Sequence, residues 1–345
     1  MTAYSFLDDY SEGCHPEILD LLTTSNMTQQ TAYGNDVYTL EARRLIAERC
    51  GRADVPVHFV GGGTLANLTI CAAVLRSHEA IISPTSGHIA MRETGAIEAT
   101  GHKIISMPHV DGKLTPDAIE EAVAGNSQGP HMAKPRMVYI SNATEFGTVY
   151  ALDELKALRK TCDVHDLLLL IDGARLGAAL GSDHATGTTL ADVARLADIF
   201  WIGGTKAGTL FGEAIVIPNS SLADDFDFHI KQRGALLAKG RSLGVQFQAL
   251  FSDDLFERSA VSANAAAQTL AAGVVSAGFE LAAETESNQV FALLPNPVIE
   301  VLQQSFSFYV WEPRTEDHSV IRLVTSWATD AVQVDRFVEL IMASR

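Results

Sequence analysis

A lysine in a glycine-rich turn is the first residue of this sequence whose surroundings suggest chemistry. The apolar run 199–202 ends in Gly203-Gly204-Thr205-Lys206, a pattern that predicts a buried strand followed by a tight turn. An unpaired ammonium beside such a strand is costly, and a lysine that loses its proton becomes a nucleophile that forms Schiff bases with carbonyl compounds. The alternative is a surface lysine in a glycine-rich loop, and the rest of the chain decides between the two.

The loop Gly61-Gly62-Gly63-Thr64 is a candidate anion site. It joins an expected strand at 55–60 to an expected helix at 65–76, and backbone N–H groups at the start of a helix bind anions such as phosphate. The loop lacks the residue spacing of a nucleotide P-loop, and the sequence contains no GxGxxG motif. The alternative interpretation is a plain tight turn.

Asp172 is a candidate partner for a bound heterocycle. It ends the apolar run 167–171, and Arg175 follows three residues later. A carboxylate in apolar surroundings usually pairs with a cation, so an Asp172–Arg175 ion pair or a helix cap is one interpretation. The other is that Asp172 binds a ring nitrogen of the heterocycle. His88, at the start of a helix expected over 88–100, either caps that helix or stacks on the ring and transfers protons.

A Schiff-base lysine, an anion loop and a carboxylate for a ring nitrogen together point to pyridoxal 5′-phosphate (PLP). This cofactor acts as an electron sink while its pyridine nitrogen stays protonated, and a buried carboxylate keeps it so. The four cysteines, Cys14, Cys50, Cys71 and Cys162, are widely scattered. We therefore expect neither a disulfide framework nor a metal site.

The elements that would position these residues alternate between strand and helix. Expected strands lie at 55–60, 80–83, 103–107, 136–141, 167–171 and 198–202, with helical segments between them. This order predicts an α/β fold with a mostly parallel sheet covered on both faces, and ligands of such sheets gather where the strands end. The pattern changes after residue 217. We expect a large domain over 1–245, with an N-terminal arm at 1–30, and a smaller α+β domain over 246–345.

The composition excludes several classes of partner. The chain has 345 residues with 42 acidic and 25 basic side chains, a net charge of −17, which argues against nucleic acid or an anionic membrane surface. No apolar run is long enough to span a bilayer, and the N-terminus lacks the pattern of a signal peptide. A soluble, cytoplasmic protein is expected.

Over nearly its whole length the sequence resembles the low-specificity L-threonine aldolases, which are PLP enzymes of the aspartate-aminotransferase-like fold. The combination of matching segments is specific, although each one alone is a weak signal. These segments are DDYSEGCHPE, AYGND, GGGTLAN, GHIAMRETGA, GKLTP, IDGARLGAA, GGTKAG and IRLVTSW.

The resemblance implies which residues bind the cofactor. Lys206 would hold PLP as a Schiff base, Asp172 would bind its pyridine nitrogen, and His88 would stack on its ring. Gly63 and Thr64 would bind its phosphate, helped by an arginine at position 241 from a neighbouring subunit.

The resemblance also implies which residues bind the substrate. Arg175 would contact both the cofactor's 3-hydroxyl and the substrate carboxylate. Ser11 and Arg322 would bind that carboxylate as well, and Tyr33 would enter the active site of a neighbouring subunit. Because Tyr33 and the basic run 231–241 would serve a neighbour, Arg241 included, we expect at least a homodimer and favour a homotetramer.

The implied reaction is retro-aldol cleavage of an L-3-hydroxy-2-amino acid, such as L-threonine or L-allo-threonine, to glycine and an aldehyde. Many members of the family carry a histidine at the position of Glu145, whereas one bacterial branch has ATE-x-G there, as this chain does. The expected base is His88, alone or through a water also held by Glu145, and a purely structural Glu145 is the alternative. Other open readings are a lyase for phenylserine-type substrates, a β-elimination, a step in specialised metabolism, and a PLP-binding protein without catalysis.

Overall fold

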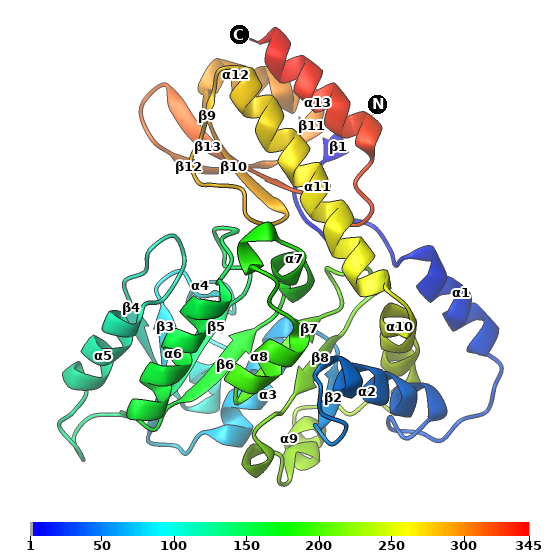
Figure 1. Ribbon diagram of the computed structural model, residues 1–345, viewed down its shortest axis with the longest axis vertical. Helices are drawn as coiled ribbons and strands as arrows, with labels where there is room; N and C mark the ends of the chain where they lie inside the picture. Colours follow the sequence, from blue (N-terminus) through cyan, green and yellow to red (C-terminus); the bar gives the residue numbers. More distant parts are fainter. Residues whose placement is uncertain (1–2, 345) are drawn as a thin grey trace.

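A seven-stranded sheet forms the centre of the larger region of the molecule (Figure 1). The computed structural model describes residues 3–344. In spatial order the strands are β2 (Val57–Val60), β8 (Glu213–Val216), β7 (Ile199–Gly203), β6 (Leu168–Asp172), β5 (Lys134–Ser141), β3 (Glu79–Pro84) and β4 (Lys103–Met107). Only β8 runs antiparallel to its neighbours, β2 and β7. The predicted mostly parallel sheet is confirmed.

Helices cover both faces of this sheet. Alternate residues of each strand point to opposite faces, so each strand contributes side chains to two separate cores. Leu169 and Ile171 lie in one core, and Leu168 and Leu170 lie in the other. By the same alternation Asp172 belongs to the face of Leu168 and Leu170. Helices with residues in the first core are α1 (Pro16–Ser25), α2 (Val37–Arg49), α5 (Pro116–Gly125), α6 (Leu152–Val164), α7 (Leu176–Leu180), α8 (Leu190–Leu196) and α10 (Arg241–Ser252). The second core takes residues of α3 (Gly63–Val74), α4 (His88–Met91) and α9 (Phe226–Gln232).

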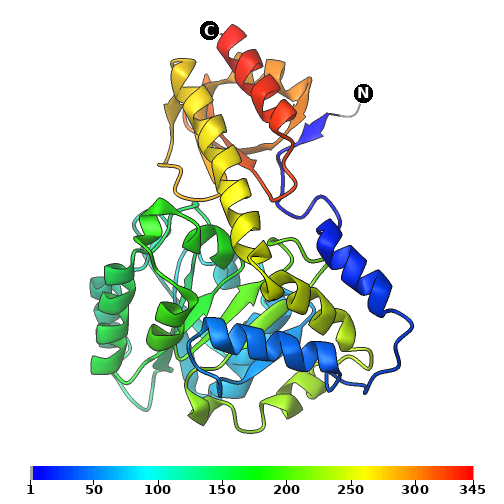
Figure 2. The ribbon, with the colours of Figure 1, turned by 45° about the vertical axis from the view of Figure 1, so that its right-hand side comes forward.

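The C-terminal region has a sheet and a core of its own. Its antiparallel strands, in spatial order, are β12 (Tyr309–Pro313), β13 (His318–Val324), β10 (Gln289–Pro295) and β9 (Glu280–Leu281). The core is completed by α11 (Leu255–Ser276), α12 (Asn296–Gln303) and α13 (Ala331–Ala343). Figure 2 shows α11 running from one region into the other. Leu255 at its start lies in the first core, whereas Leu270 lies in the C-terminal one.

The N-terminal arm packs on the C-terminal region. Strand β1 (Tyr4–Ser5) pairs in parallel with β11 (Phe306–Ser307), and Phe6 is fully buried in the C-terminal core. The predicted domain boundary at residue 245 falls inside α10. The two cores divide further along the chain, within α11, and the division of the chain into domains stays a prediction.

One predicted helix, 88–100, is interrupted. It consists of α4 and a short 3-10 helix, η1 (Glu98–Thr100). Thr94 and Gly95 between them adopt positive φ values of 54° and 74°, which no right-handed helix contains. Two further 3-10 helices are η2 (Asp183–Ala185) and η3 (Ser220–Leu222).

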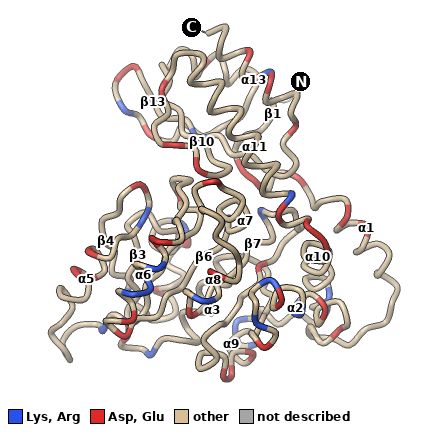
Figure 3. The backbone as a smooth tube through the Cα atoms, in the orientation of Figure 1, with Lys and Arg blue, Asp and Glu red and all other residues tan. Residues whose placement is uncertain are grey.

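Acidic and basic positions are interspersed over both regions of the molecule (Figure 3). Within residues 3–344, no helix is both long enough and apolar enough to cross a membrane. The same residues contain no cluster of three His, Cys, Asp or Glu side chains that could hold a metal ion.

Candidate active site

A cavity of about 360 Å³ lies where β5, β6 and β7 end. The carboxyl ends of parallel strands meet at one edge of a sheet, so side chains far apart in the sequence converge there. The cavity is lined by most of the predicted site residues, namely Gly63, Thr64, His88, Glu145, Asp172, Arg175 and Lys206.

Lys206 follows a turn that only glycine can form. A Cβ atom at Gly203 would lie 2.4 Å from the carbonyl oxygen of Ala174, so the end of β7 rests directly on the segment after β6. The Nζ atom of Lys206 forms no hydrogen bond or ion pair with residues 3–344, and the ring centroid of Tyr10 lies 5.9 Å from it. Burial, reinforced by the charge of Arg175, lowers the pKa of Lys206. This favours the neutral, nucleophilic amine.

Glu213, at the start of β8, stabilises the turn that precedes Lys206. Its carboxylate accepts hydrogen bonds from the backbone N–H of Gly204 and from the hydroxyl of Thr205, both at 2.9 Å. Burial raises the pKa of Glu213 to about 7, and the nearby charge of Lys206 opposes that rise. A carboxyl group that titrates near neutrality thus lines the cavity beside Lys206.

Asp172 is held by three donors. Its Oδ2 atom accepts from the hydroxyl of Tyr139 at 2.6 Å and from the amide of Asn67 at 3.0 Å, and its Oδ1 atom accepts from the N–H of Ala174 at 3.0 Å. Asn67 is fixed in turn by the indole N–H of Trp201 at 2.9 Å. The alternative of an Asp172–Arg175 ion pair is not realised among the described residues. Because a carboxylate accepts about four hydrogen bonds, Asp172 can take one more donor from the cavity.

His88 and Glu145 face the cavity together. The Nδ1 atom of His88 lies 2.8 Å from Oε1 of the buried Glu93, which leaves Nε2 free to exchange a proton. Glu145 accepts through Oε1 from the backbone N–H of His88 at 3.0 Å and from Ser141 at 2.7 Å. Its Oε2 atom is buried without a partner in the described chain, and burial raises the pKa of Glu145.

The glycine loop is the N-terminus of α3. Gly62 is the N-cap residue and offers no side chain to cap the helix, so the first backbone N–H groups point to the cavity edge uncapped. A Cβ atom at Gly63 would lie 2.8 Å from the Trp201 ring, whereas at Gly61 and Gly62 it would meet nothing within 4 Å. The loop therefore approaches Trp201 closely and leaves open space on its other side.

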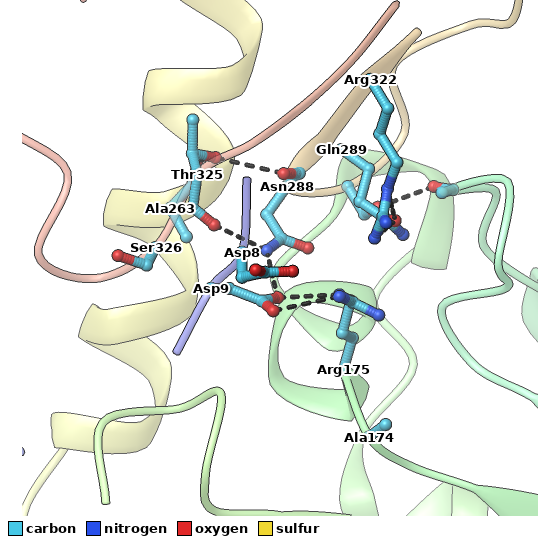
Figure 4. A network of polar contacts seen from close by, with 12 residues as sticks. Asp8, Asp9, Ala174, Arg175, Ala263, Asn288, Gln289, Arg322, Thr325 and Ser326 are labelled. Atoms are coloured by element: carbon cyan, nitrogen blue, oxygen red, sulfur yellow. Dashed lines mark hydrogen bonds and ion pairs between the residues drawn. The ribbon is translucent and has the colours of Figure 1, made fainter. Parts of the chain in front are cut away.

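Arg175, which lines the cavity, and Arg322 of the C-terminal region are both held by polar side chains (Figure 4). Arg175 donates from Nε and Nη2 to the carboxylate of Asp9, at 2.7 and 3.0 Å. Arg322, on β13, donates from Nε and Nη2 to the amide oxygen of Gln289, at 3.0 and 2.6 Å. The two guanidinium groups are close enough for the charge of Arg175 to lower the pKa of Arg322.

Four predicted residues are not among those that line this cavity, namely Arg322, Ser11, Tyr33 and Arg241. The exposed Ser11 donates to the carbonyl oxygen of Asp8 at 3.3 Å. Tyr33 is 45% exposed and lies under the ammonium of Lys231, 4.9 Å from its ring centroid. Arg241 donates to the carbonyl oxygens of Ser25 and Asn26, both at 2.8 Å, and to that of Thr28, so it caps the end of α1 in its own chain.

Known proteins with similar sequences and structures indicate which family this site belongs to. The family model described as beta-eliminating lyase matches residues 8–297. The low specificity L-threonine aldolase of Pseudomonas aeruginosa is 36% identical over 334 residues, which cover 95% of this chain and 93% of that protein. The solved structure of a threonine aldolase from Leishmania major has a TM-score of 0.97 and 48% identity, covering 99% of both chains. The chain belongs to the low-specificity L-threonine aldolase family.

The fold of the aldolase family is also that of more distant enzymes. A single mutant of the aspartate aminotransferase of Thermus thermophilus, 13% identical, matches with a TM-score of 0.72 and covers 99% of this chain and 92% of its own. The predicted aspartate-aminotransferase-like fold is confirmed. Enzymes of this fold and family depend on PLP, which confirms the predicted cofactor.

The residues of the cavity fit PLP. Lys206 offers an amine without a hydrogen-bond or ion-pair partner among residues 3–344, Asp172 keeps an unused acceptor position, and α3 offers uncapped N–H groups beside glycines that leave open space. These are the three complements that the cofactor's carbonyl carbon, ring nitrogen and phosphate require.

Several residues of this aldolase site escaped the sequence analysis. Glu213 carried a signal, because it is a charge at the start of the apolar run 214–217 just after the lysine turn. Asp9 lies in the matching segment DDYSEGCHPE but resembles any exposed acid. Asn67 and Glu93 lie in the matching segments GGGTLAN and GHIAMRETGA but were not singled out there, and Tyr139 lies in a strand without such a signal. Their roles become visible only in the packing around Asp172 and His88.

Proposed function

We propose that this chain cleaves L-3-hydroxy-2-amino acids, such as L-threonine and L-allo-threonine, to glycine and an aldehyde. The observation that carries the proposal is the convergence of Lys206, Asp172, His88 and the start of α3 on one cavity. Family membership supports the proposal, because similar proteins over nearly the whole chain are named threonine aldolases.

In this proposal Lys206 holds PLP, Asp172 holds its ring nitrogen, and Gly63 and Thr64 hold its phosphate. When bound, PLP supplies an electron sink for the pair released when the Cα–Cβ bond breaks. The remaining chemistry falls to the chain itself. Arg322 and the free Nη1 end of Arg175 grip the substrate carboxylate, which fixes the direction of the Cα–Cβ bond.

A base must then take the proton of the β-hydroxyl group. Nε2 of His88 is the proposed acceptor, because Glu93 engages Nδ1 and so orients the ring. Glu145 is the second candidate, since it lines the same cavity, its buried Oε2 atom has no partner among residues 3–344, and its raised pKa makes it a stronger base once ionised. A water held between the two would relay the proton to either one.

A second reaction is favoured by one finding, the match to a family described as beta-eliminating lyase. The assay that separates the two offers threonine, allo-threonine, phenylserine and serine to the PLP-loaded protein and measures glycine and pyruvate. Glycine with an equal amount of aldehyde from threonine or allo-threonine supports aldol cleavage. Pyruvate and ammonia from serine, without glycine from any substrate, would show that the protein catalyses β-elimination instead of aldol cleavage. Cleavage of phenylserine alone would narrow the substrate class.

We also propose a homotetramer in which neighbouring subunits complete each other's sites, and a cytoplasmic location. The exposed Tyr33, which lies outside the cavity of its own chain, supports a shared site. Fractionation of cells followed by immunodetection tests the location.

A further inference from the structure

Arg175, which lines the cavity, and the nearby Arg322 differ in whether an acid forms an ion pair with them. Arg175 forms a two-point ion pair with Asp9, whose side chain is only 1% exposed, and Asn288 donates to the same carboxylate at 2.9 Å (Figure 4). Burial alone would raise the pKa of Asp9, but the charges of Arg175 and Lys206 outweigh it and hold that pKa below its usual value. Asp9 therefore stays ionised, and its charge cancels that of Arg175.

Arg322 has no such ion-pair partner among the described residues, although the charges of Asp9 and Asp8 act on it without direct contact. Its Nε and Nη2 atoms donate to the neutral amide of Gln289, and its guanidinium lies 5.0 Å from the ring centroid of Trp311. No carboxylate within residues 3–344 forms an ion pair with it. Burial, followed by the charge of Arg175, lowers the pKa of Arg322 to about 10, which leaves it protonated at neutral pH. Of the two arginines, Arg322 is therefore the one whose positive charge is not neutralised by an ion pair and can be matched by a ligand.

The position of Asp9 is fixed by the fold. The arm that carries it is anchored by Phe6 in the C-terminal core and by the pairing of β1 with β11. Asn288, which holds Asp9, also donates to the carbonyl oxygen of Thr325 at 2.7 Å. The acid is thus tied to both regions, and a ligand carboxylate must share the site with it.

We propose that Asp9 is a specificity-determining residue: it cancels one of two arginine charges and so matches the site to amino acids with a single carboxylate. The inference rests on the proposed function, because it takes the two arginines as the carboxylate site. With Asp9 in place the pair of arginines offers one net positive charge, which a monoanion satisfies. A second ligand carboxylate would find no unmatched cation and would meet the charge of Asp9.

The test compares malonate with its monoamide, malonamate, which has nearly the same shape and one negative charge less. Binding to the PLP-loaded protein is measured by calorimetry at a pH where both malonate carboxylates are ionised. For the unaltered protein we expect dissociation constants within about threefold of each other. In Asp9→Asn, which keeps the size of the side chain, malonate should bind at least about tenfold more tightly than malonamate.

The matched control is Asp335→Asn, an exposed acid on α13, which removes the same formal charge and should leave the ratio unchanged. Tenfold preference for malonate by the unaltered protein would overturn the proposal without any variant, as would failure of both ligands to bind. An equal gain for both ligands in Asp9→Asn would assign Asp9 a purely structural role. Because the test measures binding and not catalysis, the two proposals can fail separately. If the protein shows the expected binding ratios but releases no glycine, the proposed function is wrong and the role of Asp9 still holds.

Discussion

At the scale of single residues, the lysine turn shows what a sequence can and cannot reveal. Lys206 was recognisable because two glycines and an apolar run precede it, and that local pattern requires no knowledge of the fold. Glu213 was not recognisable as a partner, because its relation to the turn depends on β8 returning antiparallel beside β7. The contact between a buried acid and a neighbouring strand can be recognised only in the three-dimensional structure.

Glu213 should leave a trace in the pH dependence of stability. Its pKa is raised from 4.5 to about 7 in the folded chain, so the folded state binds its proton more tightly than the unfolded state. Its stabilising contribution is therefore present below about 4.5 and is lost as the pH rises through about 7. Glu213→Gln, which cannot ionise, should flatten this fall in the free energy of unfolding, measured by denaturant titration at several pH values.

Glu339→Gln serves as the control, because Glu339 is exposed on α13. The loss of one hydrogen-bond acceptor in Glu213→Gln shifts the whole curve equally at every pH, so only the slope decides. An unchanged slope would show that Glu213 does not titrate in this range.

At the scale of elements, periodicity predicted the strands of the large sheet well because most of them are buried on both faces and bounded by turns. The prediction of a helix over 88–100 was wrong beyond the first turn, because Thr94 adopts a left-handed conformation that a threonine does not normally favour. The direction of β8 was equally beyond periodicity, because a buried strand has the same pattern in either direction.

Gly203→Ala should damage the junction of β6 and β7. The new Cβ atom would lie 2.4 Å from the carbonyl oxygen of Ala174, so one backbone segment must move. We expect a loss of about 1 to 3 kcal/mol in the free energy of unfolding, with weaker PLP binding because Lys206 moves with the turn. Denaturant titration and absorbance of bound PLP measure the two effects.

Gly125→Ala is the comparison variant, since its Cβ would meet nothing within 4 Å. It should leave both quantities nearly unchanged. If Gly203→Ala behaved like Gly125→Ala, the close approach of the two segments would be refuted.

At the scale of the whole molecule, the sequence did not reveal where the N-terminal arm lies. Phe6 joins a core built from residues beyond 260, and pairing between such distant segments leaves no local pattern. The arm is nonetheless what brings Asp9 to Arg175. Family resemblance identified the arm as part of the site, although it pointed to Ser11 rather than to Asp9.

The exposed apolar side chains of α2 are the surface on which we place the proposed subunit interface. Val37 and Leu40 lie three residues apart on this helix and are 59% and 50% exposed, close in sequence to the exposed Tyr33. Leu40→Asp should lower the sedimentation mass and, because the proposed oligomer shares its sites between subunits, the rate of glycine release. Val164→Asp, at an exposed apolar position at the end of α6, should change neither. A fully active Leu40→Asp oligomer of unchanged mass would exclude this surface from the interface.

The most direct test of the central claim is to find the residue that carries the cofactor. Borohydride reduces a lysine–PLP linkage to a stable amine, and peptide mapping by mass spectrometry then locates it. We predict the modification on Lys206 in the unaltered protein and its absence in Lys206→Ala, which should also release no glycine from threonine. Modification of another lysine, or glycine release by Lys206→Ala at the unaltered rate, would contradict the assignment of this cavity as the active site.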